Sequence, residues 1–191
     1  MVDLLAQQFF YYVGQCITSW AKVEEHLFEI CTSCLGANRK QVAIIYYRTP
    51  TIDSRLQLVD ELIRTILPQR ESRDGAHDHP DVVVWDKLRK EIGAEFPTRN
   101  HIAHHPVSER NLAKELNITH PGAAQDLFDF SWYEIYVSEA ERLRGRHENA
   151  KPLSVPDLAN HRVTIEALTT KLEIFRSSVL AKYAKSAPEQ E

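Results

Sequence analysis

Apolar residues recur at the spacing of an α-helix over the first 35 residues of the chain. Successive apolar positions are three or four residues apart, and the mean step of 29/8 is about 3.6, the repeat of the α-helix. Gly36 follows, and a glycine just beyond a periodic run is a usual end for a helix. The pattern therefore predicts one long amphipathic helix, with these residues on its inward side: Leu5, Phe9, Tyr12, Cys16, Trp20, Val23, Leu27, Ile30 and Cys34.

Similar spacing predicts further helices along the chain. A short apolar segment covers 42–47, and capping side chains at 51–54 open a second amphipathic run that Pro68 closes. A third helix has Trp85, Leu88, Ile92 and Phe96 on its inward side. It continues through 98–105 if Pro97 is accommodated as a kink or as the start of a new first turn. The last helix follows Pro156, and its apolar residues from 165 to 183 have a mean step of 18/5, again about 3.6.

Two stretches lack this helical pattern. The polar segment 69–81 contains Gly and Pro and predicts an exposed loop. In 127–137 aromatic and β-branched residues alternate, which predicts at least one short strand, with 117–120 as a candidate hairpin partner. Ser138 and Glu141 have the spacing of a capping box and could start a helix there instead.

These elements together predict a mainly α fold. We expect a single helical-bundle domain over residues 1–184, with four or five helices. A small irregular or β insertion covers about 107–155, and residues 185–191 form a disordered tail.

The composition narrows the class of protein without naming a function. Hydrophobic residues make up 43% and charged residues 26% of the 191, as in globular proteins, and the net charge of −4 excludes a polycationic protein that coats nucleic acid. The N-terminus does not resemble a signal peptide, and no apolar run approaches the ~20 residues of a membrane-spanning helix. We therefore expect a cytoplasmic protein with no membrane partner.

Cys31 and Cys34 form a Cys-x-x-Cys on a helix, and we interpret them as core residues, since no second pair completes a zinc site.

Reactive side chains are concentrated in the segment 96–107. Three of the nine histidines fall there within five residues, at 101, 104 and 105. On a helix, Asn100 and His104 are neighbours one turn apart, and so are His101 and His105. Arg99 lies at the edge of the inward stripe, where an arginine needs a phosphate or a carboxylate as its partner.

The run Arg99-Asn100-His101-Ile102-Ala103-His104 resembles the Arg-x4–6-His motif of HEPN domains, including the polar residue that often follows the arginine. HEPN domains are helical bundles found in bacterial defence and toxin–antitoxin systems. The segment 18–27, with Trp20 and Glu24, is similar to the first helix of several such families.

The resemblance implies a metal-independent endoribonuclease that acts as a homodimer and leaves a 2′,3′-cyclic phosphate. It implies that Arg99 holds the scissile phosphate, that His104 is the general acid or base, and that Asn100 orients one of the two. RNA is then the candidate substrate, and an antitoxin is a possible partner. No cofactor and no metal are implied. The tyrosine that follows the histidine in some HEPN toxins is missing, because His105 and Pro106 stand there, which speaks against the version regulated by nucleotidylation.

Other interpretations of the same residues remain open. Glu24 is a candidate partner of Arg99, and such a pair could be only a structural clamp. The chain would then be a non-catalytic helical interaction or nucleotide-binding module. His101 and His105 have a spacing that can bind a metal, and His77, Asp78 and His79 offer further ligands. We interpret His101 and His105 as residues that flank, and at most support, the site.

Overall fold

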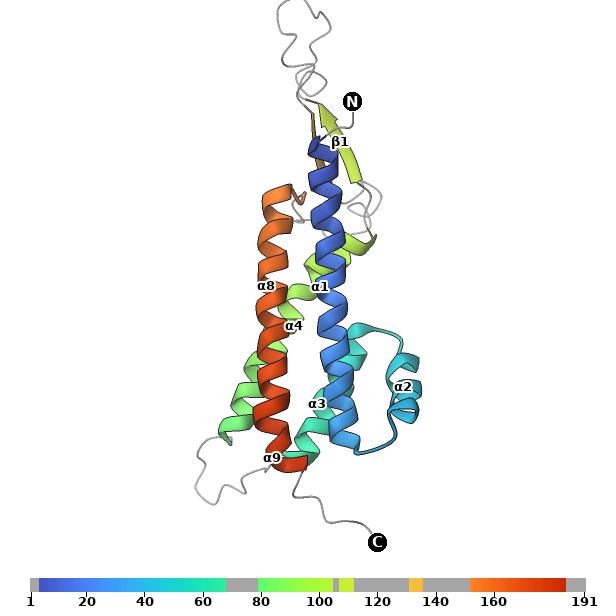
Figure 1. Cartoon of the computed structure of the whole chain (residues 1–191), viewed down its shortest axis with the longest axis vertical. Coiled ribbons are helices and arrows are strands. Elements are labelled where there is room, and N and C mark those ends of the chain that lie inside the picture. The colour runs from blue at the N-terminus through green and yellow to red at the C-terminus, as the bar shows by residue number, and fades with distance from the viewer. Residues whose placement is uncertain (1–3, 68–78, 105–106, 112–130, 136–151, 185–191) are drawn as a thin grey trace, which may run out of the picture. The chain divides into compact units, whose positions relative to one another are not determined.

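Helices account for most of the structure, a computed structural model that describes residues 4–67, 79–104, 107–111, 131–135 and 152–184 (Figure 1). The predicted mainly α fold, a bundle of helices with a small β part, is confirmed. Along the chain the elements are α1 (Leu4–Leu35), α2 (Arg39–Arg48), α3 (Ile52–Ile66), α4 (Pro80–His104), β1 (Val107–Asn111), β2 (Ser131–Ile135), α8 (Val155–Ile174), the π-helix η2 (Phe175–Leu180) and α9 (Ala181–Ala184).

Local signals in the sequence set the ends of the first three helices. Gly36 has φ 57°, a left-handed conformation that glycine adopts without strain, and its N–H donates to the carbonyl of Thr32 at 3.1 Å. The side chain of Asn38 accepts from the N–H of Lys40 at the start of α2. Thr51 caps α3 in the predicted way, because its hydroxyl accepts from the N–H of Ser54 at 3.1 Å.

Helix α4 is longer than the sequence pattern indicated. It begins at Pro80, so the last two residues of the predicted loop 69–81 are helical, and 68–78 lie outside the described residues. His79 caps the helix, since its ring Nδ1 accepts from the N–H of Asp81 at 3.2 Å. Pro97 lies inside the helix, which continues to His104 without a break. The continuation of this helix past Pro97 is therefore confirmed.

The β part consists of one antiparallel pair. β1 and β2 are in register from Val107 opposite Ile135 to Asn111 opposite Ser131, and Ile135 also bridges to Leu153. The predicted strand within 127–137 is confirmed as β2. Its partner is β1, which we had not predicted, and 117–120 and the capping box at 138–141 lie outside the described residues.

The end of the last long helix departs from the regular spacing that we predicted for 165–183. Residues Phe175–Leu180 form a π-helix, in which i→i+5 hydrogen bonds place more residues in each turn. This packing buries Val179 and Leu180, which are neighbours in sequence, together with Phe175 five residues before Leu180. The hydroxyls of Ser177 and Ser178 both donate to the carbonyl of Ile174, at the start of the π-helical turn.

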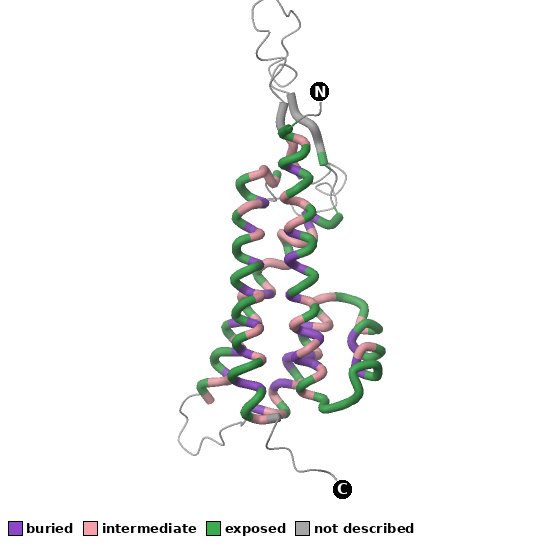
Figure 2. Tube along the Cα trace, in the orientation of Figure 1, coloured by how far each residue is buried: buried purple, intermediate pink, exposed green. Residues whose placement is uncertain are grey.

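The chain forms two compact units, and three helices pass through both. Unit 1 comprises Met1–Thr18 and Pro97–Thr164, and unit 2 comprises Ser19–Phe96 and Ile165–Glu191. The prediction of a single domain over 1–184 stays a prediction. Buried positions recur at helical spacing along α1, α3, α4 and α8, as an amphipathic helix requires (Figure 2).

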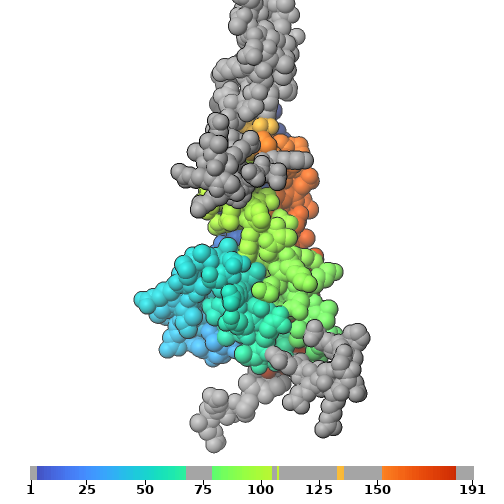
Figure 3. Space-filling view, turned by 180° about the vertical axis from the view of Figure 1, so that it is seen from behind, coloured from blue at the N-terminus to red at the C-terminus, as the bar shows by residue number. Residues whose placement is uncertain are grey.

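Unit 2 contains a large apolar core. Residues from α1, α2, α3, the first part of α4, α8 and η2 form one cluster of 22 buried side chains, including the fully buried Trp85, Tyr46, Phe175 and Ile92. Seen from behind, α3 and the first part of α4 lie side by side (Figure 3). Polar contacts between α3 and α4 centre on Asp60, which is 8% exposed. It accepts from the indole Nε1 of Trp85 at 2.9 Å and pairs with Arg64 at 3.1 Å.

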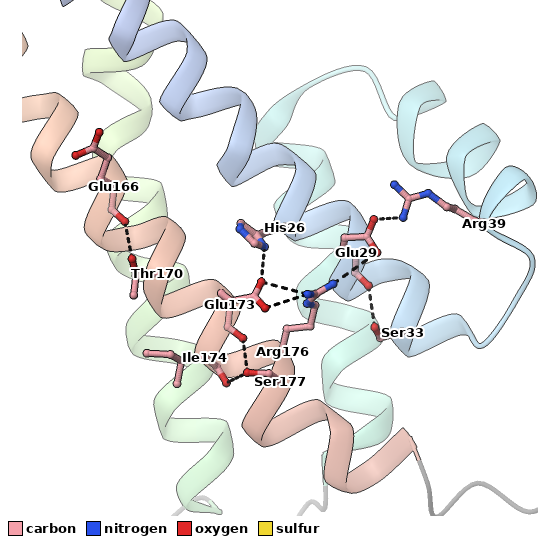
Figure 4. Close-up of polar contacts among 10 residues, drawn as sticks. All are labelled: His26, Glu29, Ser33, Arg39, Glu166, Thr170, Glu173, Ile174, Arg176 and Ser177. Atoms are coloured by element: carbon pink, nitrogen blue, oxygen red, sulfur yellow. Dashed lines mark hydrogen bonds and ion pairs between the residues drawn. The ribbon is translucent and has the colours of Figure 1, made fainter.

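A second set of charges joins α1, α2, α8 and η2 at the surface of unit 2 (Figure 4). Arg176 pairs with Glu173 at 3.0 Å and with Glu29 at 3.7 Å, and Glu29 also pairs with Arg39. His26 Nδ1 lies 3.3 Å from Glu173. These contacts hold η2 against α1 through alternating charges.

Unit 1 has a smaller core among the described residues. It consists of Phe9, Cys16, Ile102, Ile135 and Leu158, which come from α1, α4, β2 and α8. The thiol of Cys16 donates to the carbonyl of Leu158 at 3.2 Å. Unit 1 also contains the C-terminal turns of α4, on which the predicted site residues lie.

Over the described ranges, every helix is too short or too polar to span a membrane.

Candidate functional site

The candidate site lies on the last two turns of α4. The guanidinium of Arg99 donates from Nη1 to the side-chain oxygen of Asn100 at 3.1 Å, and both side chains are half-buried. A hydrogen bond between adjacent helical residues draws the guanidinium around the helix toward the side on which Asn100 projects. The arginine predicted to bind a phosphate therefore already has a neutral polar partner.

His104, the last residue of α4, is exposed to solvent. A helix turns by about 100° and rises about 1.5 Å per residue, so Asn100 and His104 are about 40° apart around the axis, one turn from each other. Arg99 and His104 are about 140° apart and about 7.5 Å along the axis, which is too far around the helix for direct neighbours. Asn100 connects the two residues, because it lies on the same face as His104 and accepts a hydrogen bond from Arg99.

His101 and His104 have opposite exposure. His101 is only 6% exposed, next to the buried Ile102, whereas His104 is exposed. His101 therefore belongs to the packed side of the helix, and His104 is accessible to a ligand. His105, the other predicted flanking residue, lies outside the described residues.

The buried face of α4 changes near Pro97. Up to Phe96 the inward residues follow the stripe through Ile92, and this stripe, extended at about 100° per residue, leads to Arg99. The structure instead buries His101, about 180° around the helix from Ile92. Arg99 is consequently only half-buried, and the helix presents a different side to the core of unit 1.

His161 on α8 is a second buried imidazole in unit 1, at 6% exposure. It was not among the residues that we predicted from the sequence. Its spacing of three residues from the buried Leu158 would have placed it on the inward side of α8. Both rings are thus enclosed by protein atoms, and neither is open to solvent in the way His104 is.

Glu24 lies in unit 2, where it forms an ion pair with Arg55 of α3 at 2.9 Å. Arg55 also donates from Nε to the carbonyl of Thr49 at 3.0 Å, and the hydroxyl of Tyr46 donates to the backbone carbonyl of Glu24. These contacts make Glu24 part of the clamp between α1, α2 and α3. Its pairing with Arg99 stays a prediction.

The other candidate chemistry can be placed only in part. Among the described residues, no group of three or more histidines, cysteines or acidic residues is arranged to hold a metal ion. His79 caps α4, and His77 and Asp78 lie outside those residues. Burial raises the pKa of the Cys31 thiol to about 11 and of the Cys34 thiol to about 12, which fits core residues and not a reactive thiol pair.

A comparison of the chain with protein-family models, curated proteins and solved structures finds no match.

Proposed function

We propose that this chain is a HEPN-like, metal-independent endoribonuclease. The observation that carries the proposal is the arrangement of Arg99, Asn100 and His104 at the end of α4, in a protein built mainly of helices. The amide of Asn100, which accepts from the half-buried guanidinium of Arg99, lies one helical turn before the exposed imidazole of His104 and on the same side of the helix. These are the residue types that phosphodiester cleavage by a ribose hydroxyl needs.

In this proposal His104 acts as the general base on the ribose 2′-OH. The 2′ oxygen attacks phosphorus, the bond from phosphorus to the 5′ oxygen breaks, and the leaving oxygen takes up a proton from a protonated imidazole or from water. The products are a 2′,3′-cyclic phosphate and a free 5′-OH. Arg99 stabilises the charge that develops on the phosphoryl oxygens, because a planar guanidinium can contact two of them.

Asn100 is a positioning residue in this scheme. Its side-chain oxygen accepts from Arg99, and its NH2 group remains as a donor toward a phosphate or toward the imidazole one turn later. One protomer contributes one Arg–Asn–His set. We propose that two sets meet in a homodimer, and that an antitoxin restrains the activity.

The proposal is tested with the purified full chain and a panel of structured RNAs, with and without EDTA. His104→Ala should lower the cleavage rate about 10²–10⁴-fold, the usual contribution of a general acid–base residue. The adjacent His105→Ala is the matched control and should change the rate less than about threefold if His105 only flanks the site. Arg99→Lys should also be impaired, because an ammonium lacks the planar fork of a guanidinium.

Three results would contradict the proposal. The first is a cleavage rate that His104→Ala leaves unchanged. The second is loss of cleavage in EDTA, and the third is a product that carries a 3′-OH instead of a cyclic phosphate. Circular dichroism of each variant verifies that the helices are retained.

Exposed apolar side chains favour a second candidate function, the non-catalytic interaction module. Five of them lie on the unit 1 part of α1: Leu4, Leu5, Phe10, Tyr11 and Ile17, with exposures from 48% to 77%. Phe10 and Ile17, seven residues apart, lie on one side of α1, and a contiguous exposed apolar patch commonly marks a surface that another protein covers. If the wild-type chain cleaves no RNA of the panel and forms a protein complex that Phe10→Ser weakens, this second function is supported and the first is not.

A further inference from the structure

A pocket in unit 2 opens between the first part of α4 and the junction of α8 with η2. Its volume is about 420 Å³, within the range of about 300–1,000 Å³ that is usual for sites of small ligands. Every residue that lines it belongs to unit 2, so it is separate from the candidate site on the last turns of α4.

The walls of the pocket are apolar. Leu88, Phe175 and Val179 are buried members of the core and form its inner part, while Val84 and Ile174 stand at its edge. Val84 is 49% exposed and Ile174 is 57% exposed, so apolar surface faces water at the opening. An apolar ligand body would cover this surface and remove it from water.

The π-helical turn contributes to the shape of this pocket. Phe175, Ser178 and Val179 are pocket residues and also members of η2. The wider turn carries Val179 and Leu180 to the core, while Ser178 remains exposed at the pocket. π-helical turns occur frequently at functional sites, and here the turn coincides with the cavity.

The charged side chains that line the pocket are Lys87, Glu91 and Lys171. Lys171 is already paired with Glu91 at 2.5 Å. Lys87 is exposed and has no ion-pair partner among the described residues. The pocket therefore has one excess positive charge, carried by Lys87 next to apolar walls.

We propose that this pocket binds a small amphipathic anion, an alkyl carboxylate of medium chain length. The alkyl chain lies against Leu88, Phe175 and Val179, and the carboxylate pairs with Lys87. Charge and apolarity together select this class, because an alkyl cation would face Lys87 and a fully polar anion would leave the walls exposed. The proposal does not depend on the RNA-cleaving function.

The test is isothermal titration of the full chain with sodium decanoate below its micelle concentration. We expect 1:1 binding with a Kd of about 100 μM or tighter, which is within reach of a ligand with about a dozen heavy atoms. Decyltrimethylammonium should bind at least about tenfold more weakly, because like charges then meet at Lys87. Acetate should not bind.

Two pairs of matched variants locate the site. Val84→Trp fills the opening and should abolish binding, whereas Val83→Trp changes a similarly exposed neighbour outside the pocket and should leave the Kd within about twofold. Lys87→Glu should weaken decanoate binding at least about tenfold, and Lys90→Glu, an exposed lysine outside the pocket, should not.

Absence of saturable decanoate binding to the wild-type chain would overturn the proposal, as would equal effects of the two members of either pair. Sedimentation velocity adds a separate readout. If the oligomeric state of Val84→Trp differs from that of the wild-type chain and the state of Val83→Trp does not, a second copy covers the pocket. The ligand proposal is then wrong.

Discussion

Unit 1 and unit 2 differ in the size of their described apolar cores and in the polar groups that are buried in them. In unit 2, 22 buried side chains from six helical segments form one core, and its buried carboxylate Asp60 is satisfied by an indole and an arginine. In unit 1, the described residues contribute five buried apolar side chains and two buried imidazoles, His101 and His161. The residues with candidate chemistry for RNA cleavage lie in the unit with the smaller described core.

This difference in the described cores leads to an expectation about the stability of the two units. A core of large, fully buried apolar residues stabilises a fold but offers few groups that can react. Imidazole and guanidinium groups near a smaller core are held less firmly by packing and depend on hydrogen bonds for their positions. We therefore expect unit 2 to determine global stability and unit 1 to open first.

The largest expected effect comes from one isoleucine in each unit, both on α4. Ile92→Ala should lower the free energy of unfolding by about 4 kcal/mol, because the residue is fully buried in the large core. Ile102→Ala, at 7% exposure in the smaller core, should lower it by about 2 kcal/mol. Urea unfolding followed by circular dichroism measures both values. Equal losses in the two variants would show that the units are equally well packed.

Alkaline pH should destabilise the protein through its buried thiols. Burial raises the pKa of Cys16 and Cys31 from 9.0 to about 11, and of Cys34 from 9.0 to about 12. The folded chain therefore binds more protons than the unfolded chain between about pH 9 and 11, and its stability falls as pH rises through that range. Below about pH 8 these thiols should cause no pH dependence.

Variants assign this alkaline loss to the units. Two of the three thiols lie in unit 2, so replacing Cys31 and Cys34 by alanine should flatten the urea midpoint between pH 8 and 10.5 more than Cys16→Ala does. The opposite result would be a urea midpoint that still falls steeply with pH in the Cys31/Cys34 variant but not in Cys16→Ala. That result would assign the loss of stability at alkaline pH to unit 1.

The smallest expected effect comes from a helical glycine in unit 1. Gly14 lies in α1, and a Cβ built there meets nothing within 4 Å. Gly14→Ala should raise the free energy of unfolding by about 0.5–1 kcal/mol, because alanine loses less backbone entropy in a helix. Gly93→Ala in unit 2 is the matched comparison, with the same open surroundings. If only Gly93→Ala raises the thermal midpoint, unit 1 does not contribute to the global transition.

Regular hydrophobic spacing predicted the helices well, because α3 and the part of α1 from Phe9 onward each bury a stripe of apolar residues and end at recognisable caps. The prediction was wrong for Leu5, which we placed on the inward side of α1 and which is 48% exposed. Hydrophobic spacing did not predict the π-helix. Two steps of four residues connect Phe175, Val179 and Tyr183 across the π-helical turn, so the mean spacing does not reveal it. Strand β1 was missed because its sequence, VSERN, is polar, and the pairing with β2 depends on backbone hydrogen bonds.

At the candidate site, the spacing of Asn100 and His104 on one face followed from the helix repeat, and α4 does continue through them. The burial of His101 could not be predicted in the same way. The stripe through Ile92 and Phe96 points to Arg99, and only the change of buried face near Pro97 brings His101 inward. A change of face depends on the elements that pack against a helix, and a single sequence does not specify them.

The order of the two units along the chain has a consequence during synthesis. The helices α1 to α4 supply most of the unit 2 core, but Ile165, Leu168 and Leu172 of the same core come after the 68 residues 97–164. At about 5–20 residues per second, a ribosome needs about 3–14 s to make that stretch. We expect the side of Trp85 that Phe175 covers in the folded chain to stay uncovered for that time. We therefore expect the nascent chain to expose this apolar surface until α8 has left the ribosome.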